Sequence, residues 1–195
     1  MLKSMSGSIF RSTLRGCLLL PLLLATPAFA EPDQPRVRLE TSEGAIEIAL
    51  NARAAPETVE NFLDYVASDF YEGTVFHRVI EGFMIQGGGM TADLSTRETR
   101  DPIAFEESGL ENRRGTVAMA RTADPDSATS QFFINLAGNP ALDFKSLHQP
   151  GYTVFGEVVS GMAVVDAIAA TPTERQGPHA DVPREPIVIE SAERL

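Results

Sequence analysis

Short apolar segments broken by glycine run through the middle of the chain and limit its fold more than any other feature. They cover residues 75–80, 83–86, 116–120, 131–135 and 152–159. Segments this short are typical of strands, and their return at regular spacing with turn signals between them is typical of an antiparallel sheet that closes on itself. The spacing therefore predicts a mainly β domain built around a barrel.

The residues before and after these segments predict further elements of the same domain. Alternating apolar residues on both sides of a glycine-containing turn at residues 42–44 predict a β-hairpin over residues 37–50. Proline in a first turn, followed by apolar residues at helical spacing, predicts a helix over about residues 56–68. Residues 162–169 carry a second apolar stripe of this kind. The two helices would cover the open ends of the barrel.

The C-terminal part of the chain is less regular. A polar, proline-rich loop is expected over about residues 171–186, and the apolar residues at 186–189 predict a last strand. We find no internal repeat in the sequence. One folded domain over residues 31–195 therefore accounts for the chain, and its length suffices for a stable core without disulfide bonds.

Residues 1–30 differ in composition from the rest and are typical of a cleavable secretory signal peptide. They contain no Asp or Glu, and their charged residues are Lys3, Arg11 and Arg15. An apolar run at 17–24 follows, and then the small-residue pattern Ala-Phe-Ala at 28–30. The run is too short for a membrane-spanning helix, which needs about 20 apolar residues. We therefore expect cleavage after Ala30 and a mature protein that is periplasmic or secreted.

The charge and cysteine content exclude several classes of function. The chain has 16 Lys and Arg against 27 Asp and Glu, a net charge of −11, and loss of the basic signal peptide would make it more acidic. Nucleic-acid binders need a basic face, so neither nucleic acid nor an anionic membrane is expected as a partner. The only cysteine is Cys17, which leaves with the signal, so the mature protein would have no disulfide and no thiol nucleophile.

One segment carries the side chains best suited to chemistry. The sequence Phe-His-Arg-Val-Ile-Glu-Gly-Phe-Met-Ile-Gln-Gly-Gly begins at Phe76 and mixes aromatic, cationic and amide groups on two predicted strands. Because side chains alternate across a strand, we expect Phe76, Arg78 and Ile80 on one face. The intervening His77 and Val79 would lie on the other face.

This segment resembles the central signature of the cyclophilins. The resemblance continues in order through Ala-Met-Ala-Arg at 118–121, Ser-Gln-Phe-Phe-Ile at 130–134, Leu-Asp at 142–143, Tyr-x-Val-Phe-Gly at 152–156 and Gly-Met-x-Val-Val-Asp at 161–166. It covers essentially the whole mature chain. It implies a closed eight-stranded antiparallel β-barrel capped by two α-helices, and a groove on its outer face that binds an X-Pro peptide. It also implies peptidyl-prolyl cis/trans isomerase activity.

The same resemblance implies a site, with Arg78 as the catalytic residue. The substrate-binding residues would be Phe83, Met84, Gln86, Ala120, Arg121, Gln131, Phe133, Leu142 and Tyr152. The pocket for the proline ring would be formed by Phe83, Met84, Phe133 and Leu142. Gln86, Gln131 and the backbone near Arg121 would hold the peptide.

Three positions depart from the best-known eukaryotic cyclophilins. Arg121 stands in place of an asparagine, Tyr152 in place of a histidine and Ala141 in place of a tryptophan. The last change removes a large aromatic wall. We therefore expect weak inhibition by cyclosporin and intact catalysis.

The reaction explains why an arginine suits such a site. Rotation about a peptide bond faces a barrier of about 18–20 kcal/mol, and no bond is broken. The twisted amide loses resonance and its proline nitrogen becomes basic, so a donor near that nitrogen binds the twisted state better than either planar one. Arg78 can be that donor because its guanidinium stays charged. No cofactor is needed, and the three histidines show no metal-ligand spacing.

Several of these residues also have a plainer interpretation. An arginine beside aromatic side chains is commonly a surface residue that packs its stem on apolar groups. Gln86 and Gln131 would serve equally well as structural amides. His77 is expected to be structural, because this reaction moves no proton. Glu106 and Glu107 are expected on a solvated surface.

Two classes of function remain open at this point. The first is an isomerase that assists the folding of exported proteins by acting on their X-Pro bonds. The alternative is a non-catalytic proline-peptide binding module or holdase chaperone, or a catalytically silent scaffold. Arg78 favours the isomerase, since a pure binder has no use for a donor aimed at the twisted nitrogen. The expected partners are proline-containing segments of unfolded exported proteins, and we expect a monomer.

Overall fold

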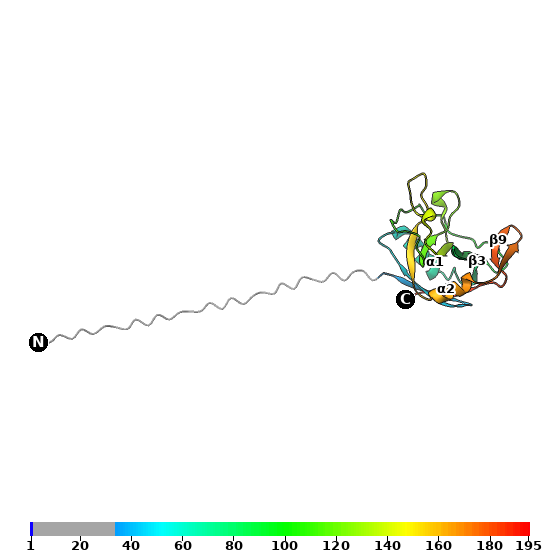
Figure 1. Ribbon diagram of the computed structural model, residues 1–195, viewed down its shortest axis with the longest axis horizontal. Coiled ribbons are helices and arrows are strands. Elements are labelled where there is room, and N and C mark those ends of the chain that lie inside the picture. The colour runs from blue at the N-terminus through cyan, green and yellow to red at the C-terminus, as the bar shows by residue number, and fades with distance from the viewer. Residues whose placement is uncertain (2–33) are drawn as a thin grey trace. The chain divides into compact units, whose positions relative to one another are not determined.

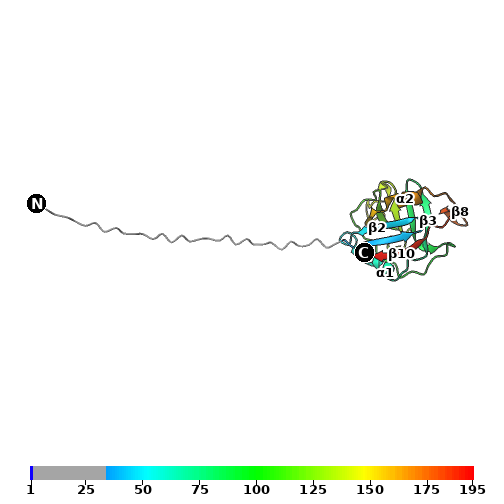
Figure 2. The same cartoon turned by 90° about the horizontal axis from the view of Figure 1, so that it is seen from below.

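The computed structural model describes residues 34–195 together with Met1. Apart from Met1, the predicted signal peptide lies outside the described residues, so its cleavage stays a prediction. The described residues form a barrel of antiparallel strands accompanied by two helices and a small β-hairpin (Figures 1 and 2). None of the helices within 34–195 is both long enough and apolar enough to cross a membrane.

Eight strands form the main sheet, and each pairs in antiparallel fashion with its neighbours. They are β1 (Arg36–Thr41), β2 (Gly44–Leu50), β3 (Thr74–Ile80), β4 (Met84–Thr91), β5 (Thr116–Met119), β6 (Phe132–Asn135), β7 (Val154–Ser160) and β10 (Ile189–Arg194). Their order in the sheet is β10-β1-β2-β7-β5-β6-β4-β3. The strand segments expected from the sequence are therefore confirmed.

The two edges of this sheet meet and bring it close to full closure. The Gly73 N–H donates to the Ile189 carbonyl at 2.8 Å, and the Phe76 N–H donates to the Ile187 carbonyl at 2.9 Å. Val75 and Val188 form an isolated antiparallel bridge between them. Closure satisfies backbone groups that an edge strand would leave unpaired, and it confirms the expected antiparallel barrel.

Helix α1 (Pro56–Ala67) begins with the proline that marked its start in the sequence and buries Val59, Phe62 and Val66 on one face. The Phe62 ring lies inside the barrel, 5.6 Å from Phe132 and 5.2 Å from Phe155 between ring centroids. The second helix, α2 (Met162–Ala169), buries Val165, Ile168 and Ala169. Both predicted helices are confirmed.

The start of α1 is capped by a residue far away in the sequence. Ala55 at the N-cap has no side chain that could accept a hydrogen bond. Instead, one Glu106 carboxylate oxygen accepts from the Glu57 N–H at 3.0 Å, and the other accepts from the Thr58 N–H at 2.7 Å and its hydroxyl at 2.6 Å. A carboxylate at this place satisfies free N–H groups and complements the helix dipole. The expectation that Glu106 belongs to a solvated surface is wrong, whereas Glu107 is exposed.

Alternation along the strands divides the buried apolar side chains into two clusters. On β6, Phe132 and Ile134 join the barrel interior, whereas Phe133 between them points to the opposite face. The interior cluster is the main hydrophobic core. The second, called the outer cluster below, comprises Ile80, Phe83, Met84, Ala118, Ala120, Phe133, Leu142, Tyr152 and Val154. One sheet therefore carries a core on its inner face and a smaller apolar surface on its outer face.

A bulge in β3 changes which side chains share a face. Phe76 pairs with Gly87 and Arg78 pairs with Gln86, so two steps along β3 match one step along β4. His77 is the extra residue. Phe76 consequently lies in the barrel core, whereas Arg78 is exposed. The expectation that Phe76 and Arg78 share a face is wrong, because simple alternation does not hold across a bulge.

Residues 171–186 contain regular structure where a loop was expected. Thr173–Gln176 (β8) and His179–Pro183 (β9) form a two-stranded antiparallel hairpin. Gly177 in its turn has a φ of 58°, a conformation that favours glycine. The sequence concealed the hairpin because its side chains are mostly polar and only Val182 and Pro183 within it are buried.

The last strand also begins later than expected, at Ile189 instead of Pro186. Proline has no N–H to donate to a sheet. The two residues before Ile189 contact β3 through the bridge and hydrogen bond that close the barrel. The apolar residues at 186–189 were therefore correctly placed next to the sheet. The residues before Ile189, however, close the barrel against β3 and are not part of strand β10.

Candidate functional site

The outer cluster contains most of the residues expected to bind substrate. Its buried floor consists of Met84 on β4, Phe133 on β6, Ala118 on β5 and Val154 on β7. The partly exposed residues packed against this floor include Phe83, Ala120, Leu142 and Tyr152. The sequence analysis did not assign Ala118 and Val154 to the site, although alternation with the core residues Val117 and Phe155 would have placed them on this face.

Register joins the floor to Arg78 in one row across five strands. Arg78 on β3 pairs with Gln86 on β4, which pairs with Phe133 on β6. Phe133 pairs with Ala118 on β5, which pairs with Val154 on β7. Directly opposed residues have Cβ atoms about 4.5–5.5 Å apart and lie on the same face. A cation, an amide, an aromatic ring and two small apolar groups thus follow one another across the outer face.

Tyr152 and Arg121 form one wall of this surface. The Tyr152 ring meets Phe133 edge to face, with 5.5 Å between ring centroids. The guanidinium of Arg121 lies 4.7 Å from the centre of the Tyr152 ring. Its Nε and Nη2 donate to the Gly151 carbonyl at 3.0 and 2.6 Å, and its Nη1 donates to the Thr122 carbonyl at 2.8 Å. The arginine that replaces the asparagine of eukaryotic relatives therefore supports Tyr152 through the backbone beside it.

A polar network that the sequence analysis missed holds the loops that carry Phe83 and Leu142. The Asn139 side chain donates to the Phe83 carbonyl at 3.0 Å and to the Asn135 side-chain oxygen at 2.7 Å. Asp143 accepts from the Asn112 N–H at 2.7 Å and from its side-chain amide at 3.0 Å. These bonds hold the loops that carry Phe83 and Leu142. The asparagines show no periodic pattern in the sequence. Only the ability of their side chains to form hydrogen bonds could have suggested this role.

Two loops of the site are joined by the backbone. The Tyr152 N–H donates to the Leu142 carbonyl at 2.9 Å. Leu142 ends a short 3-10 turn, Pro140–Leu142, in which Ala141 is exposed. The position that would carry the aromatic wall of eukaryotic relatives is therefore beside the outer cluster and adds no ring to it.

Gln86 and Gln131 contact each other. The Gln86 side-chain amide donates to the Gln131 side-chain oxygen at 3.0 Å. Gln131 lies directly over β4, where a Cβ on Gly89 would come within 2.3 Å of its Cγ. Glycine at position 89 is therefore a condition for this placement. The pair still offers the NH₂ group of Gln131 and an acceptor on Gln86 to a peptide.

Arg78 lies at the end of the row on β3. Its side chain is 44% exposed, and its Nε is 3.9 Å from an Asp181 carboxylate oxygen on β9. A long cationic side chain at this place can reach across Gln86 toward the apolar floor. The structure thus brings the expected site residues to one face, with the cation at one edge and the aromatic groups in the centre.

His77, next to Arg78 in sequence, is buried on the side of the β8–β9 hairpin. It lines a small cavity together with Val182 and Pro183 of β9. Burial lowers the pKa of His77 from 6.5 to about 4, and the charges of His179 and Arg78 add to this effect, whereas the Val75 backbone raises the pKa. His77 is therefore neutral at physiological pH, and its place beneath the hairpin, outside the outer cluster, fits the expected structural role. Within residues 34–195, no three His, Cys, Asp or Glu side chains gather in a metal-binding arrangement.

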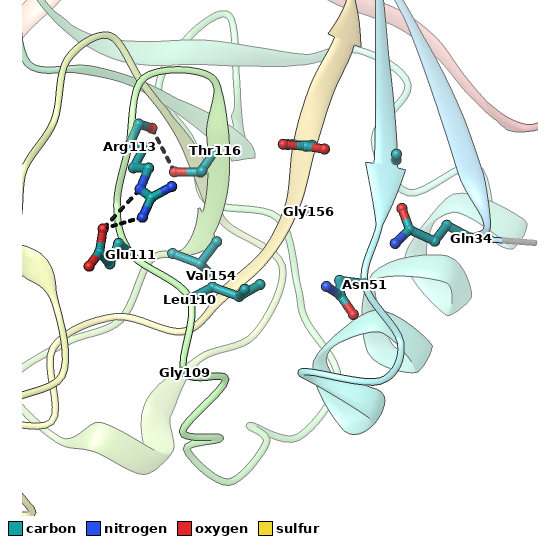
Figure 3. A pocket seen from close by; sticks show the side chains of 11 residues that line it. Gln34, Asn51, Gly109, Leu110, Glu111, Arg113, Thr116, Val154 and Gly156 are labelled. Carbon is teal, nitrogen blue, oxygen red and sulfur yellow. Dashed lines mark hydrogen bonds and ion pairs between the residues drawn. The ribbon is translucent and has the colours of Figure 1, made fainter. Parts of the chain in front are cut away.

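A separate pocket of about 340 Å³ lies beside β2, β5 and β7 (Figure 3). Ala49, Leu110 and Val154 supply its apolar side chains, and Glu111 and Arg113 form an ion pair at 2.7 Å on its rim. None of the residues expected to bind substrate lines this pocket. Val154 belongs both to the pocket wall and to the floor of the outer cluster.

Comparisons with known proteins agree with this arrangement. Residues 36–194 match the family model described as cyclophilin type peptidyl-prolyl cis-trans isomerase/CLD. Peptidyl-prolyl cis-trans isomerase A of Dickeya dadantii (strain 3937) is 53% identical over 174 residues, which are 89% of this chain and 91% of that protein. Peptidyl-prolyl cis-trans isomerase B of Escherichia coli (strain K12) is 53% identical over 158 residues, which are 80% of this chain and 96% of that protein.

A solved structure supports the fold. The cyclophilin type peptidyl-prolyl cis-trans isomerase of Cryptosporidium parvum, crystallised in the presence of the dipeptide Ala-Pro, is similar with a TM-score of 0.65 at 28% identity. The similarity covers 80% of this chain and 96% of that chain. The family model covers nearly all of the described domain, and the bacterial relatives are isomerases by name. The chain is a peptidyl-prolyl cis-trans isomerase, and it belongs to the cyclophilin family.

Proposed function

We propose that this isomerase acts on X-Pro bonds of exported proteins, in the periplasm or outside the cell, after loss of residues 1–30. The signal pattern that ends at Ala30 supports export. The observation that carries the site is the row of Arg78, Gln86, Phe133, Ala118 and Val154 across the outer face. This row, with a cation next to an apolar surface, supports a site for a proline ring.

In this proposal the apolar floor binds the proline ring. Phe133 and Met84 lie beneath it, and Phe83, Leu142 and Tyr152 border it. The dipeptide Ala-Pro, in whose presence the Cryptosporidium relative was crystallised, has the chemistry that such a floor would accept. Gln86 and Gln131 hold the chain on either side of the proline through their remaining amide groups. The ring stays fixed while the carbonyl before it turns.

Arg78 supplies the interaction that favours the twisted amide. Its guanidinium donates to the proline nitrogen only when loss of resonance gives that nitrogen a lone pair. The group therefore binds the transition state better than either planar isomer, which is the condition for raising kcat. The reaction breaks no bond, so the chain's own residues suffice for the chemistry.

The magnitudes show that Arg78 does not act alone. Turnover in milliseconds requires about 10⁵-fold acceleration, or about 7 kcal/mol, because each decade corresponds to 1.36 kcal/mol. One charge-assisted hydrogen bond contributes about 1.5–3 kcal/mol. The remainder comes from fixing the proline ring and from excluding water, which stabilises the planar amide more than the twisted one. The apolar character of the outer cluster fits this division.

A refolding assay tests the proposed role against the binding-module alternative. The purified protein should accelerate both a protease-coupled X-Pro peptide assay and the proline-limited phase of an exported client, which takes about 10–100 s without help. A holdase would reduce aggregation of the client without shortening that phase.

Export is tested separately by fractionating a bacterial host that produces the full chain. The intact mass of the exported product should correspond to a chain beginning at Glu31, and a product that retains residues 1–30 would contradict the proposal.

A further inference from the structure

The β8–β9 hairpin brings a carboxylate to the proposed catalytic arginine. Asp181 on β9 lies with one carboxylate oxygen 3.9 Å from the Arg78 Nε, and the two side chains are each 44% exposed. Val182 and Pro183, which follow Asp181, are buried and fix the strand next to β3. The carboxylate therefore lies on a strand whose position is fixed by its buried neighbours Val182 and Pro183.

We infer that Asp181 is a positioning residue for Arg78, and that the β8–β9 hairpin sets the direction in which the guanidinium points. The inference rests on the role proposed for Arg78. The carboxylate lies 3.9 Å from Nε, the inner nitrogen of the guanidinium, so the two terminal nitrogens stay free to face the peptide. A free arginine side chain samples many rotamers, and an anchor removes part of this freedom before the substrate binds.

The backbone at Asp181 supports a dedicated placement. Its φ of 60° lies in the left-handed region, which few residues other than glycine adopt without strain. Aspartate and asparagine are the side chains that tolerate this conformation best. Such positions persist where the surrounding structure holds them, and they are enriched at functional sites. Here the unusual backbone turns a carboxylate toward Arg78.

The ion pair contributes little as a stabilising contact. Exposed ion pairs stabilise a fold only slightly, and both members of this pair are more than a third exposed. If the pair served only stability, its loss would go unnoticed in turnover. The same hairpin offers a matched control, because Glu174 on β8 lies 3.5 Å from the Arg184 Nε and is similarly exposed.

The test compares four variants with the wild-type protein in an X-Pro peptide assay with an uncharged peptide. Asp181→Asn keeps the side-chain shape and suits the left-handed backbone while removing the charge. Glu174→Gln removes a charge from the same hairpin. Arg78→Ala and the double variant Arg78→Ala/Asp181→Asn complete a cycle that isolates the coupling between the two residues. Melting temperature and peptide Kd are measured for every variant.

We expect Asp181→Asn to lower kcat about two- to fivefold, with peptide Kd and melting temperature close to wild type. Glu174→Gln should keep wild-type turnover. In the Arg78→Ala background, Asp181→Asn should have no further effect. Raising the ionic strength should bring the wild-type protein toward the Asp181→Asn variant, because salt screens exposed charges.

The outcomes separate the two proposals. If Arg78→Ala loses turnover and Asp181→Asn does not, Asp181 has no positioning role and the role of Arg78 stands. If Asp181→Asn lowers turnover equally with and without Arg78, the carboxylate acts by another route and the inference is wrong. If Arg78→Ala keeps its turnover, the role proposed for Arg78 fails and the inference fails with it.

Discussion

Two arginines border the outer cluster from opposite sides of the strand order, and the chain holds them in opposite ways. Arg121, after β5, donates to two backbone carbonyls and covers the Tyr152 ring. Arg78, on β3, is exposed and has one long contact, to Asp181. The first guanidinium uses its donors within the protein, and under the function proposed above the second keeps its terminal donors for the peptide. Local hydrogen bonding therefore distinguishes a structural arginine from one suited to catalysis.

The largest expected effect removes the free arginine. Arg78→Ala should lower kcat and kcat/KM together by about 10²–10³, from the 2–4 kcal/mol typical of a pre-organised donor, and leave peptide Kd nearly unchanged. Stability should change by less than about 1 kcal/mol. Turnover, peptide Kd and melting temperature measured on one preparation separate these effects.

Arg113→Ala is a suitable control for this variant. Arg113 is exposed, forms its ion pair with Glu111, and is not one of the residues of the outer cluster. It should keep wild-type turnover. Near-normal turnover of Arg78→Ala, or a loss explained by unfolding, would contradict the contrast between the two arginines.

Measuring stability across a range of pH tests whether His77, next to Arg78, is buried in its neutral form. His77 has a pKa of about 4 in the folded protein against 6.5 when exposed. Between these values the unfolded chain binds a proton at His77 and the folded protein does not. The contribution of neutral His77 to the free energy of unfolding is therefore complete above pH 6.5 and is lost as pH falls toward 4. The difference corresponds to about 3 kcal/mol. Chemical denaturation across this range should show it.

The His77→Gln variant should lack this part of the pH dependence. Its unfolding free energy at neutral pH should be lower than that of the wild-type protein, and the gap should narrow on acidification. His148→Gln, at an exposed position, should keep the wild-type profile. Parallel profiles for wild type and His77→Gln would show that His77 is not held neutral beneath the hairpin.

The structural arginine should give a different kinetic pattern. Arg121→Lys should weaken peptide binding about tenfold and leave kcat within about twofold, because the wall beside Tyr152 loosens while the donor to the proline nitrogen stays. Lysine cannot replace the planar fork that bonds the Gly151 carbonyl through two nitrogens. A drop in kcat at unchanged Kd would place Arg121 in the chemical step and remove the contrast with Arg78.

The smallest expected effect is on stability and concerns Glu106, which caps α1 and holds the residue next to Tyr152. Glu106 caps α1, and its carbonyl accepts from the Thr153 hydroxyl at 2.8 Å. Glu106→Gln should lower the unfolding free energy by about 1 kcal/mol, the usual value of a helix cap, with turnover unchanged. Glu107→Gln should stay within about 0.5 kcal/mol of wild type. Equal stability of the two variants would show that the cap contributes nothing.

The sequence predicted the barrel from periodicity and the site from the resemblance to the cyclophilins, and regular alternation agrees with the face on which the site residues lie. Alternation on β4, β5 and β6 assigns Met84, Ala118 and Phe133 to one face, and the helical stripe assigns Phe62 to the core. These assignments follow from the geometry of regular strands and helices. Where a regular element also carries an apolar face, the sequence pattern was sufficient; the mostly polar β8–β9 hairpin is regular but has no such face.

The features that escaped prediction interrupt that regularity or connect distant residues. The bulge at His77 shifts the face of Phe76, and no pattern of apolar residues announces an extra residue in a strand. Glu106 and Asn139 act through hydrogen bonds to the backbone of other elements. Their partners depend on the folded arrangement, which the local sequence does not encode.

Closure of the barrel by its last strand has a consequence for how the protein is made. β10 lies between β1 and the edge of β3. One side of β1, the first strand of the domain, therefore stays unpaired until β10, one of the last segments, has been synthesised. Contacts between residues so far apart in the chain form slowly and late, after the entropy of a long loop has been lost. A chain emerging from a ribosome or a membrane pore would hold two open strand edges until its final residues arrive. The native barrel therefore forms only once β10 is available, and chains in which β10 has not yet paired are exposed to edge-to-edge aggregation.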